Sequence, residues 1–435
     1  MLRRLGPSLK TAGETEGGAL FPSRLEFNPP AHGVWNIVHI GMLVPQAHQI
    51  YVCAVNCMRG VVLTAAEMGA SDRFSCVLLK EEDITRGTVE EITLRGISDV
   101  LRKLPKLPPC VIVFPVCTHH FLGVSMARVY RELEREFPDV DFVRAFMDPV
   151  FRKRLPPDQR LRGAMYEPLP PCEPEEKRAL LLGSDFALDP DCELRSLLRD
   201  GGVVLTDIQS CADYAQFKAL SRAGTILCVH PSGLYGAKKT AERLGRRLLY
   251  LPMSFSFDEI EREENTLCEA LGLPLPDFQR EIGESEAALS DALRTVGDTP
   301  VAIDASAHPR PLGLARLLLS RGFRVTEVYL DAVSPEEESD LVWLRENSPS
   351  LALSSIVLPD MRAAPRVRGQ RTLAIGQKAA WFTGTGYFVN IVQGGGLWGF
   401  SGVRRMARLM AEAVTEEKDT RELIPRKGWG CVSCL

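Results

Sequence analysis

Short apolar runs alternate with amphipathic stretches along most of the chain. Runs such as Cys110–Phe114 and Ala179–Leu182 are apolar without interruption, as are strands buried on both faces of a parallel sheet. Stretches such as Val89–Leu101 instead repeat apolar residues at helical spacing. Because this alternation restarts twice, the pattern predicts an α/β fold: three stacked Rossmann-like domains with parallel sheets flanked by helices.

A proline-rich stretch and a long helix between the runs set the expected domain boundaries. The proline-rich stretch Glu167–Pro171 ends the first domain, and the long helix expected over Asp277–Val296 bridges the second and third. The predicted parts are an N-terminal arm (1–28), a first α/β domain (29–170), a second (171–296), a third (297–415) and a C-terminal tail (416–435). The arm lacks periodicity, so it is expected to be a loose segment.

Composition and charge exclude several classes of protein. The 435 residues are 45% hydrophobic and 25% charged, as in an ordinary globular protein. A formal net charge of -4 gives no electrostatic footprint for nucleic acid. No apolar run reaches about 18 residues, so no membrane-spanning helix is expected, and the start of the chain lacks the apolar core of a signal peptide. We therefore expect a cytoplasmic protein that binds neither nucleic acid nor membranes.

The chain has 12 cysteines, which is many for a cytoplasmic protein. In a reducing compartment they form no disulfide framework, so their excess favours a thiolate-ligated metal centre. Cys57, ahead of a helix expected from Val61, and Cys117 are each expected at the carboxyl end of a strand, where parallel sheets place their sites. Spacing alone favours the plainer alternative of buried core thiols, because no Cys-x-x-Cys-x-x-Cys run is present. The candidate metal ligands are His32, Cys53, Cys57 and Cys117.

Two loops are candidate binding sites. Cys228–Gly236 leads from a strand into a helix, where backbone amides are open to a ligand. Gly394–Gly402 precedes a basic helix, but its spacing fits neither a dinucleotide-binding fingerprint nor a P-loop. The plainer alternative is a pair of tight turns and a core tryptophan. The residues predicted to line a substrate cavity between the domains are Cys228, His230, Gly394, Gly395, Gly396 and Trp398.

Two further features are weaker candidates. His119 and His120 follow Cys117, and either could deliver a proton to a substrate under reduction, although histidines at helix starts are more often structural. Cys431 and Cys434 form a Cys-x-x-Cys pair near the end of the chain, where a frayed tail is the favoured alternative to a metal or redox role.

Five segments, in order along the chain, carry a resemblance to a known family. They are Ala31–Trp35, Ile50–Cys57, Ser75–Gly87, Val111–Gly123 and Gly394–Met410. The set resembles the nitrogenase component 1 family and covers most of residues 30 to 415. The resemblance implies an iron–sulfur cluster (4Fe–4S or larger) held by Cys57 and Cys117 in the first domain, with His32 or Cys53 contributing.

Departures from the family pattern restrict the function. His32 lies near the place of the family's first cluster cysteine. Nitrogenase holds its substrate cofactor with a cysteine and a histidine; near these places the chain has Cys228, offset by one residue, and Trp398. These differences argue against a molybdenum–iron cofactor and against nitrogen fixation. An aromatic side chain at position 398 suits a flat organic substrate or a filled cavity.

The resemblance implies an oxidoreductase that takes electrons from a nitrogenase iron-protein-like ATPase. The electrons would pass through the iron–sulfur cluster to an unidentified substrate. The family also implies a dimer with the cluster near the interface, as a homodimer or as a heterodimer with a paralogous subunit. The alternative function is a scaffold for metallocluster assembly, and a third hypothesis is a metal-free α/β small-molecule binder.

Overall fold

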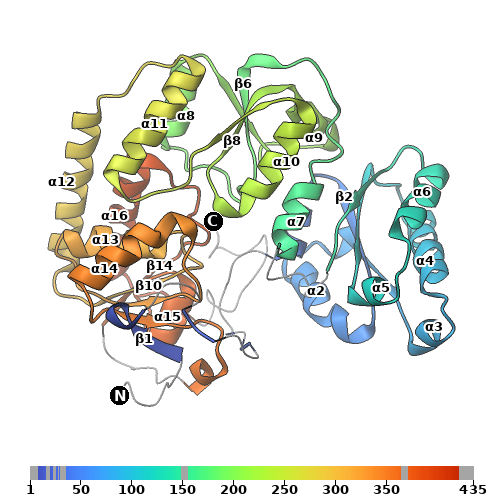
Figure 1. Ribbon diagram of the computed structural model, residues 1–435, viewed down its shortest axis with the longest axis horizontal. Helices are drawn as coiled ribbons and strands as arrows, with labels where there is room; N and C mark the ends of the chain where they lie inside the picture. The colour runs from blue at the N-terminus through green and yellow to red at the C-terminus, as the bar shows by residue number, and fades with distance from the viewer. Residues whose placement is uncertain are drawn as a thin grey trace.

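The computed structural model describes residues 8–15, 20–22, 26–27, 29, 36–147, 155–363 and 371–420. It contains three sheets, and each sheet with its helices is called a unit here (Figure 1). The first unit lies at the right of Figure 1, the second at the top and the third at the lower left. The predicted fold class, α/β with parallel sheets flanked by helices, is confirmed.

The first unit is built on four strands in the order β3-β2-β4-β5, all parallel. They are β2 (Ala47–Cys53), β3 (Phe74–Leu78), β4 (Cys110–Pro115) and β5 (Asp141–Arg144). Its helices are α1 (Ile37–Met42), α2 (Val55–Glu67), α3 (Glu81–Thr85), α4 (Val89–Lys103), α5 (Cys117–Phe121) and α6 (Met126–Glu136). Tyr51 packs with residues of α1 and α2, whereas Ile50 and Val52 pack with α4 and α6. Because both faces are covered, the central strand β4 is buried and apolar along its whole length.

The second unit has four parallel strands in the order β7-β6-β8-β9. They are β6 (Glu175–Leu181), β7 (Val204–Asp207), β8 (Ala223–Cys228) and β9 (Arg247–Tyr250). The helices around it are α7 (Pro157–Ala164), α8 (Glu193–Asp200), α9 (Tyr214–Ala219), α10 (Leu234–Leu244) and α11 (Phe257–Leu271). One hydrophobic core runs from Tyr51 through Leu161 of α7 to Cys228, so the first and second units pack together.

The third unit has six strands in the order β1-β12-β11-β10-β13-β14. They are β1 (Leu9–Thr11), β10 (Val301–Asp304), β11 (Val325–Tyr329), β12 (Ala352–Ser354), β13 (Leu373–Ile375) and β14 (Phe388–Val389). β1 pairs antiparallel with β12, with Leu9 opposite Ser354. The expectation of a loose arm is therefore wrong for residues 9–11, because a three-residue edge strand is too short to give a periodic signal.

Helices join the second and third units along one side of the molecule. Those of the third unit are α12 (Phe278–Val296), α13 (Pro311–Ser320), α14 (Glu338–Asn347), α15 (Gln377–Thr383) and α16 (Gly399–Thr415). α12 descends from the second unit to the third, as expected for a bridging helix, and packs against α16 (Figure 1). Among the described residues, no helix is both long and apolar enough to cross a membrane.

Candidate functional site

The candidate thiol ligands lie at the carboxyl edge of the first sheet. Cys53 is the last residue of β2, and Cys117 follows β4 by one intervening residue. α2 begins at Val55 rather than at Val61, so Cys57 lies in the first turn of a helix and not in a loop. This helix start could not be predicted, because Ala54 at the N-cap has no side chain that could make a capping bond.

These thiols differ in their exposure. Cys53 is buried, and burial, followed by the nearby thiols of Cys76 and Cys57, raises its pKa to about 12. Cys57 is exposed and Cys117 is half-buried. A thiol must lose its proton to bind a metal, and the surroundings of Cys53 oppose that loss. Each chain therefore presents two accessible thiols at this edge, on α2 and α5.

The described residues do not complete a metal site within one chain. Among them, no group of three or more His, Cys, Asp or Glu side chains is arranged to hold a metal ion. The predicted ligand His32 and the pair Cys431 and Cys434 lie outside the described residues. Two thiols fit an iron–sulfur cluster only if further ligands come from elsewhere, since such clusters take four protein ligands.

The two candidate proton donors have different surroundings. His119 is buried, its Nδ1 accepts the Val116 N–H at 3.2 Å, and its Nε2 lies 2.9 Å from Thr93 Oγ1. Burial lowers the pKa of His119 to about 4. Both nitrogens of His119 are therefore engaged inside the first unit, whereas His120 is exposed beside Phe121.

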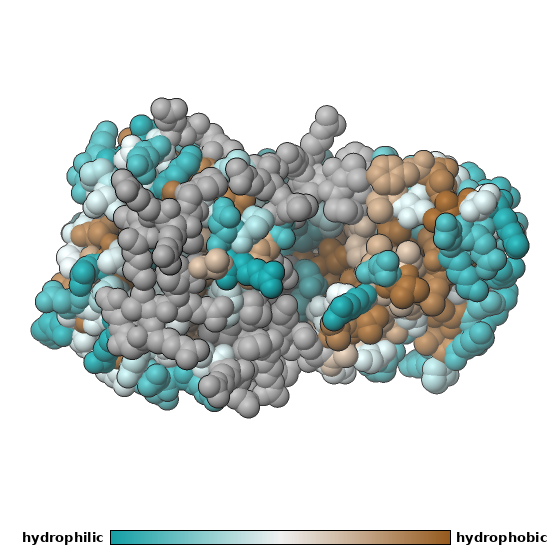
Figure 2. Space-filling view, turned by 90° about the horizontal axis from the view of Figure 1, so that it is seen from below, coloured by the Kyte–Doolittle hydropathy of each residue, from teal (hydrophilic) through white to brown (hydrophobic). Residues whose placement is uncertain are grey.

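The helices that carry the accessible thiols also carry exposed apolar side chains. Phe121 is 68% exposed, Val55 64% and Leu63 52%. Figure 2, which looks at the molecule from below, shows hydrophobic side chains gathered on this part of the first unit. We call Val55, Val62, Leu63, Phe121 and Leu122 the apolar face. Contiguous apolar surface of this kind marks a contact site for a partner.

A second polar centre lies where the second and third units meet. His230 follows β8 and His308 follows β10, and each is buried and precedes a proline. Each Nδ1 accepts a backbone N–H from two residues further on, Ser232 at 3.2 Å and Arg310 at 3.0 Å. An Nδ1 that accepts such a bond is deprotonated, so Nε2 carries the hydrogen in the neutral ring.

The two histidines form a pair, of which only His230 was predicted from the sequence. Burial lowers the pKa of His230 to about 4 and holds the pKa of His308 well below its usual range. The two rings lie close enough for a positive charge on His230 to oppose one on His308. The sequence analysis selected His230 but missed His308. The signal that could have found it is the His-Pro dipeptide that follows a strand in both units.

The structure brings Cys228 and the glycine loop to this pair. The Cys228 thiol donates to the carbonyl of His230 at 3.4 Å. A Cβ on Gly394 would lie 2.7 Å from Met253 Sδ and 3.4 Å from the His308 ring. Beside them, Asp185 accepts from Arg162 at 3.1 Å and from Gln393 at 3.0 Å. Of the predicted lining residues, Cys228, His230 and Gly394 therefore lie around the histidine pair, where they pack tightly.

Trp398 lies in the hydrophobic core of the second unit. Its side chain is 2% exposed and its Nε1 donates to the Leu251 carbonyl at 3.0 Å. The glycine loop is open on its other side, where Gly395 and Leu397 line a cleft of about 660 Å³ between the second and third units. We call it the interdomain cleft.

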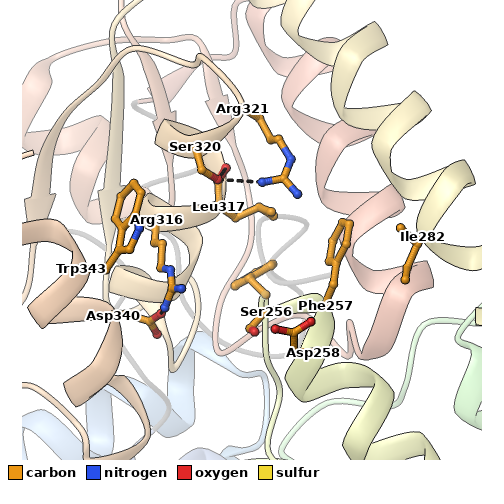
Figure 3. Close-up of a pocket in the computed structure, with 12 residues that line it drawn as sticks. Ser256, Phe257, Asp258, Ile282, Arg316, Leu317, Ser320, Arg321, Asp340 and Trp343 are labelled. Atoms are coloured by element: carbon orange, nitrogen blue, oxygen red, sulfur yellow. Dashed lines mark hydrogen bonds and ion pairs between the residues drawn. The ribbon is translucent and has the colours of Figure 1, made fainter. Parts of the chain in front are cut away.

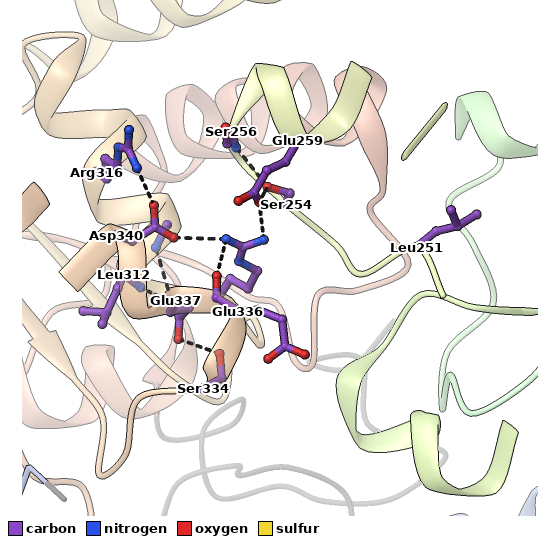
Figure 4. Close-up of polar contacts among 12 residues, drawn as sticks. Leu251, Ser254, Ser256, Glu259, Leu312, Arg316, Ser334, Glu336, Glu337 and Asp340 are labelled. Carbon is purple, nitrogen blue, oxygen red and sulfur yellow. Dashed lines mark hydrogen bonds and ion pairs between the residues drawn. The ribbon is translucent and has the colours of Figure 1, made fainter. Parts of the chain in front are cut away.

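Arg310 holds the His308 turn to its neighbours. Its buried guanidinium donates to Glu259 at 2.5 Å, to Asp340 at 3.1 Å and to the Glu336 carbonyl at 2.7 Å. Figure 4 shows these acceptors converging from α11, from α14 and from the turn before α14. The network ties the second unit to the third directly behind the histidine pair.

Another hollow, of about 430 Å³, lies between α11, α12, α13 and α14. Figure 3 shows Phe257 and Ile282 on one side of it and Trp343 and Arg316 on the other. Arg316 is paired with Asp340 at 3.1 Å, and Arg321 is paired with Glu286. Because its arginines are already neutralised, this hollow offers a ligand less charge than the interdomain cleft.

Comparison with solved structures defines the class of fold. The fold of the chain is similar to that of nitrogenase component 1. The chain is similar to the structure described as "Nitrogenase Cp1 at pH 6.5", with a TM-score of 0.66 and 12% identity over 95% of this chain and 96% of that one. It is also similar to "Nitrogenase Cp1 at pH 5", with a TM-score of 0.58 and 12% identity over 95% and 94%. No protein-family model matches the chain, and no curated protein matches it by sequence.

Proposed function

We propose that the chain is a subunit of a nitrogenase-like reductase that holds an iron–sulfur cluster between two subunits. The observation that carries the proposal is the pair of accessible thiols, Cys57 and Cys117, at the carboxyl edge of the first sheet within a nitrogenase component 1 fold. A parallel sheet places its ligands at this edge. When bound, the cluster supplies one-electron transfer to the reaction.

The number of thiols supports a shared cluster. Among the described residues, one chain offers two accessible cysteines at this sheet edge, and a four-iron cluster takes four thiolates, so two chains supply a full set. The apolar face lies on the same two helices and would be covered by the second subunit. A homodimer satisfies this count directly, whereas in a heterodimer a paralogous subunit supplies the remaining ligands.

The proposed source of electrons is an ATP-hydrolysing reductase like the nitrogenase iron protein. The resemblance of the first unit to the nitrogenase component 1 family supports this partner. Within the chain, exposed His120 could hold a proton beside Cys117, and the Nε2–H groups of His230 and His308 could donate hydrogen bonds at the centre. The product of such a reductase is a substrate reduced by electrons and protons together.

Iron analysis tests the cluster. Protein purified without oxygen should contain iron and sulfide, and the Cys57→Ser, Cys117→Ser double variant should lose both together with visible absorption. Cys172→Ser is the matched control, because Cys172 is also exposed but lies on the stretch before β6. Full iron content in the double variant would refute the assignment of these ligands.

A cluster scaffold is the second candidate function, and the exposure of Cys57 favours it. An accessible thiolate is open to exchange with an acceptor protein, as cluster transfer requires. The two functions separate in one experiment. Cluster-loaded protein is incubated either with a strong one-electron donor and candidate substrates or with an iron-free acceptor ferredoxin. A reductase turns over and keeps its iron, whereas a scaffold loses its iron to the acceptor.

A further inference from the structure

The interdomain cleft is formed by segments that leave the carboxyl ends of strands in two different sheets. One wall is residues 186–190, which follow β6, and the other is residues 390–397, which follow β14, with α16 beside them. Ligands of parallel α/β sheets bind outside these strand ends. The cleft volume of about 660 Å³ falls within the usual range for small-molecule sites.

The walls of the cleft are fixed to one another by the backbone. The Asp189 N–H donates to the Gly396 carbonyl at 3.0 Å. A Cβ on Gly396 would lie 2.1 Å from the Ala187 carbonyl oxygen, so only glycine allows this approach. On the inner side, the Gln393 N–H donates to the Ser306 carbonyl at 2.7 Å. The cleft is therefore a preformed feature and needs little ordering when a ligand binds.

The lining combines apolar walls with two arginines. The apolar residues are Phe186, Leu188, Ile391, Val392, Leu397 and Leu409. Arg195 donates to the Leu188 carbonyl at 3.2 Å and lies 4.0 Å from Asp207, both through Nη2. Arg405 reaches Asp189 and Glu412 only at 3.9 and 3.8 Å. Both guanidinium groups therefore keep donors for a ligand.

The charge of the lining favours an anion. Among the described residues that line the cleft, Asp189 is the one acidic side chain against Arg195 and Arg405. Asp189 is itself engaged, because its Oδ1 accepts the Asp191 N–H at 2.9 Å. A guanidinium offers two parallel N–H donors that match the two oxygens of a carboxylate.

We propose that the interdomain cleft binds an organic carboxylate with an apolar body. The carboxylate pairs with the guanidinium groups of Arg405 and Arg195, and the apolar body lies against Leu397 and Leu409. Under the proposed reductase function, on which this part rests, the ligand is the substrate. Binding itself needs neither the cluster nor a second subunit, because every lining residue belongs to the second and third units of one chain.

Calorimetry with a matched pair of probes tests the cleft. Naphthalene-1-carboxylate carries the proposed chemistry, and naphthalene-1-carboxamide has the same shape without the charge. The parent protein should bind the carboxylate at least about tenfold more tightly than the amide, as a charge-assisted pair predicts. Arg405→Gln should lose this preference, because it removes the positive charge that pairs with the carboxylate. The fold should stay intact, because the Arg405 side chain is half-exposed. Leu409→Trp should block both probes by filling the cleft.

The control is Arg408→Gln, which removes an exposed arginine from the same helix outside the cleft and should change nothing. Equal affinity for the two probes, binding of neither, or an unchanged preference in Arg405→Gln would overturn the proposal. The Cys57→Ser, Cys117→Ser variant should bind the carboxylate as the parent does. Retained iron in that variant would count against the cluster assignment alone, whereas equal affinity of the parent protein for the two probes would count against the cleft alone.

Discussion

Replacing Glu264 by glutamine should stabilise the protein above neutral pH. Glu264 of α11 is fully buried beside Glu193 of α8, at the junction of the second and third units. Both carboxyl groups lie against Gly399: a Cβ placed on Gly399 would lie 3.1 Å from Glu264 Oε1 and 1.6 Å from Glu193 Oε1. Burial, followed by the charge of Glu193, raises the pKa of Glu264 well above its usual range. Burial also raises the pKa of Glu193, and the nearby positive charge of Arg404 reduces that rise.

The sign follows from proton binding. Between the unfolded and the raised folded pKa, the folded state binds more protons than the unfolded chain, so stability falls as pH rises through that window. The fall begins above about pH 4.5 and continues through neutral pH. Each pH unit above the unfolded pKa, up to the folded pKa, costs about 1.4 kcal/mol of stability. Glutamine keeps the shape and cannot ionise, so Glu264→Gln should gain roughly 2–3 kcal/mol at pH 8 and almost nothing at pH 5.

Thermal unfolding at pH 5, 6, 7 and 8 measures the effect. Glu269→Gln is the matched control, since Glu269 lies on the same helix and is exposed. The other charged groups that face the pair, Glu263, Glu281 and Arg404, stay unchanged in both variants. A gain that is the same at every pH would refute the reasoning, because it would mean that ionisation of Glu264 is not its cause. A loss of stability at pH 8 would also refute it, because it would mean that Glu264 is ionised and paired in the folded protein.

Three further predictions follow from burial. Trp398→Ala should lower stability by about 3–5 kcal/mol in thermal unfolding, as expected for a large core side chain, while the folded fraction keeps its iron content; loss of iron alone would contradict this. In metal-free protein at pH 8, iodoacetamide should modify exposed Cys57 quickly and Cys53 slowly, because Cys53 is buried and burial raises its pKa to about 12; mass mapping of the labelled peptides checks the order. Phe121→Asp should shift the sedimentation of the protein from dimer to monomer, since a charge on the apolar face opposes its burial; an unchanged dimer would place the interface elsewhere.

Most of the fold was predictable because parallel sheets leave a strong local signal. β4 is buried along its whole length and reads as an uninterrupted apolar run. α11 was predicted with both of its ends, helped by Gly272, which closes it in the left-handed conformation. β1 and the start of α2 were missed, because a three-residue edge strand and an uncapped helix start leave no local mark.

The site was predictable only where one segment carries it. The accessible cysteines follow strands in sequence, so position along the chain was enough to place them at the sheet edge. The packing of the second unit against the third brings His230 next to His308 and places Arg195 and Arg405 in the same cleft. No local pattern encodes the distance between residues so far apart in the chain. The cluster ligation and the substrate site therefore stay predictions.

The pairing of β1 with β12 has a consequence for how the chain folds during synthesis. The strand at Leu9–Thr11 is made before the first and second sheets, but its partner at Ala352–Ser354 is made after them. The first and second sheets contain only strands made earlier, so they can form while translation continues. The return of β1, which covers the open edge of β12, must therefore wait until β12 has been made. Until β1 returns, that edge is a template for another nascent chain, and a ribosome-bound chaperone would find its target there.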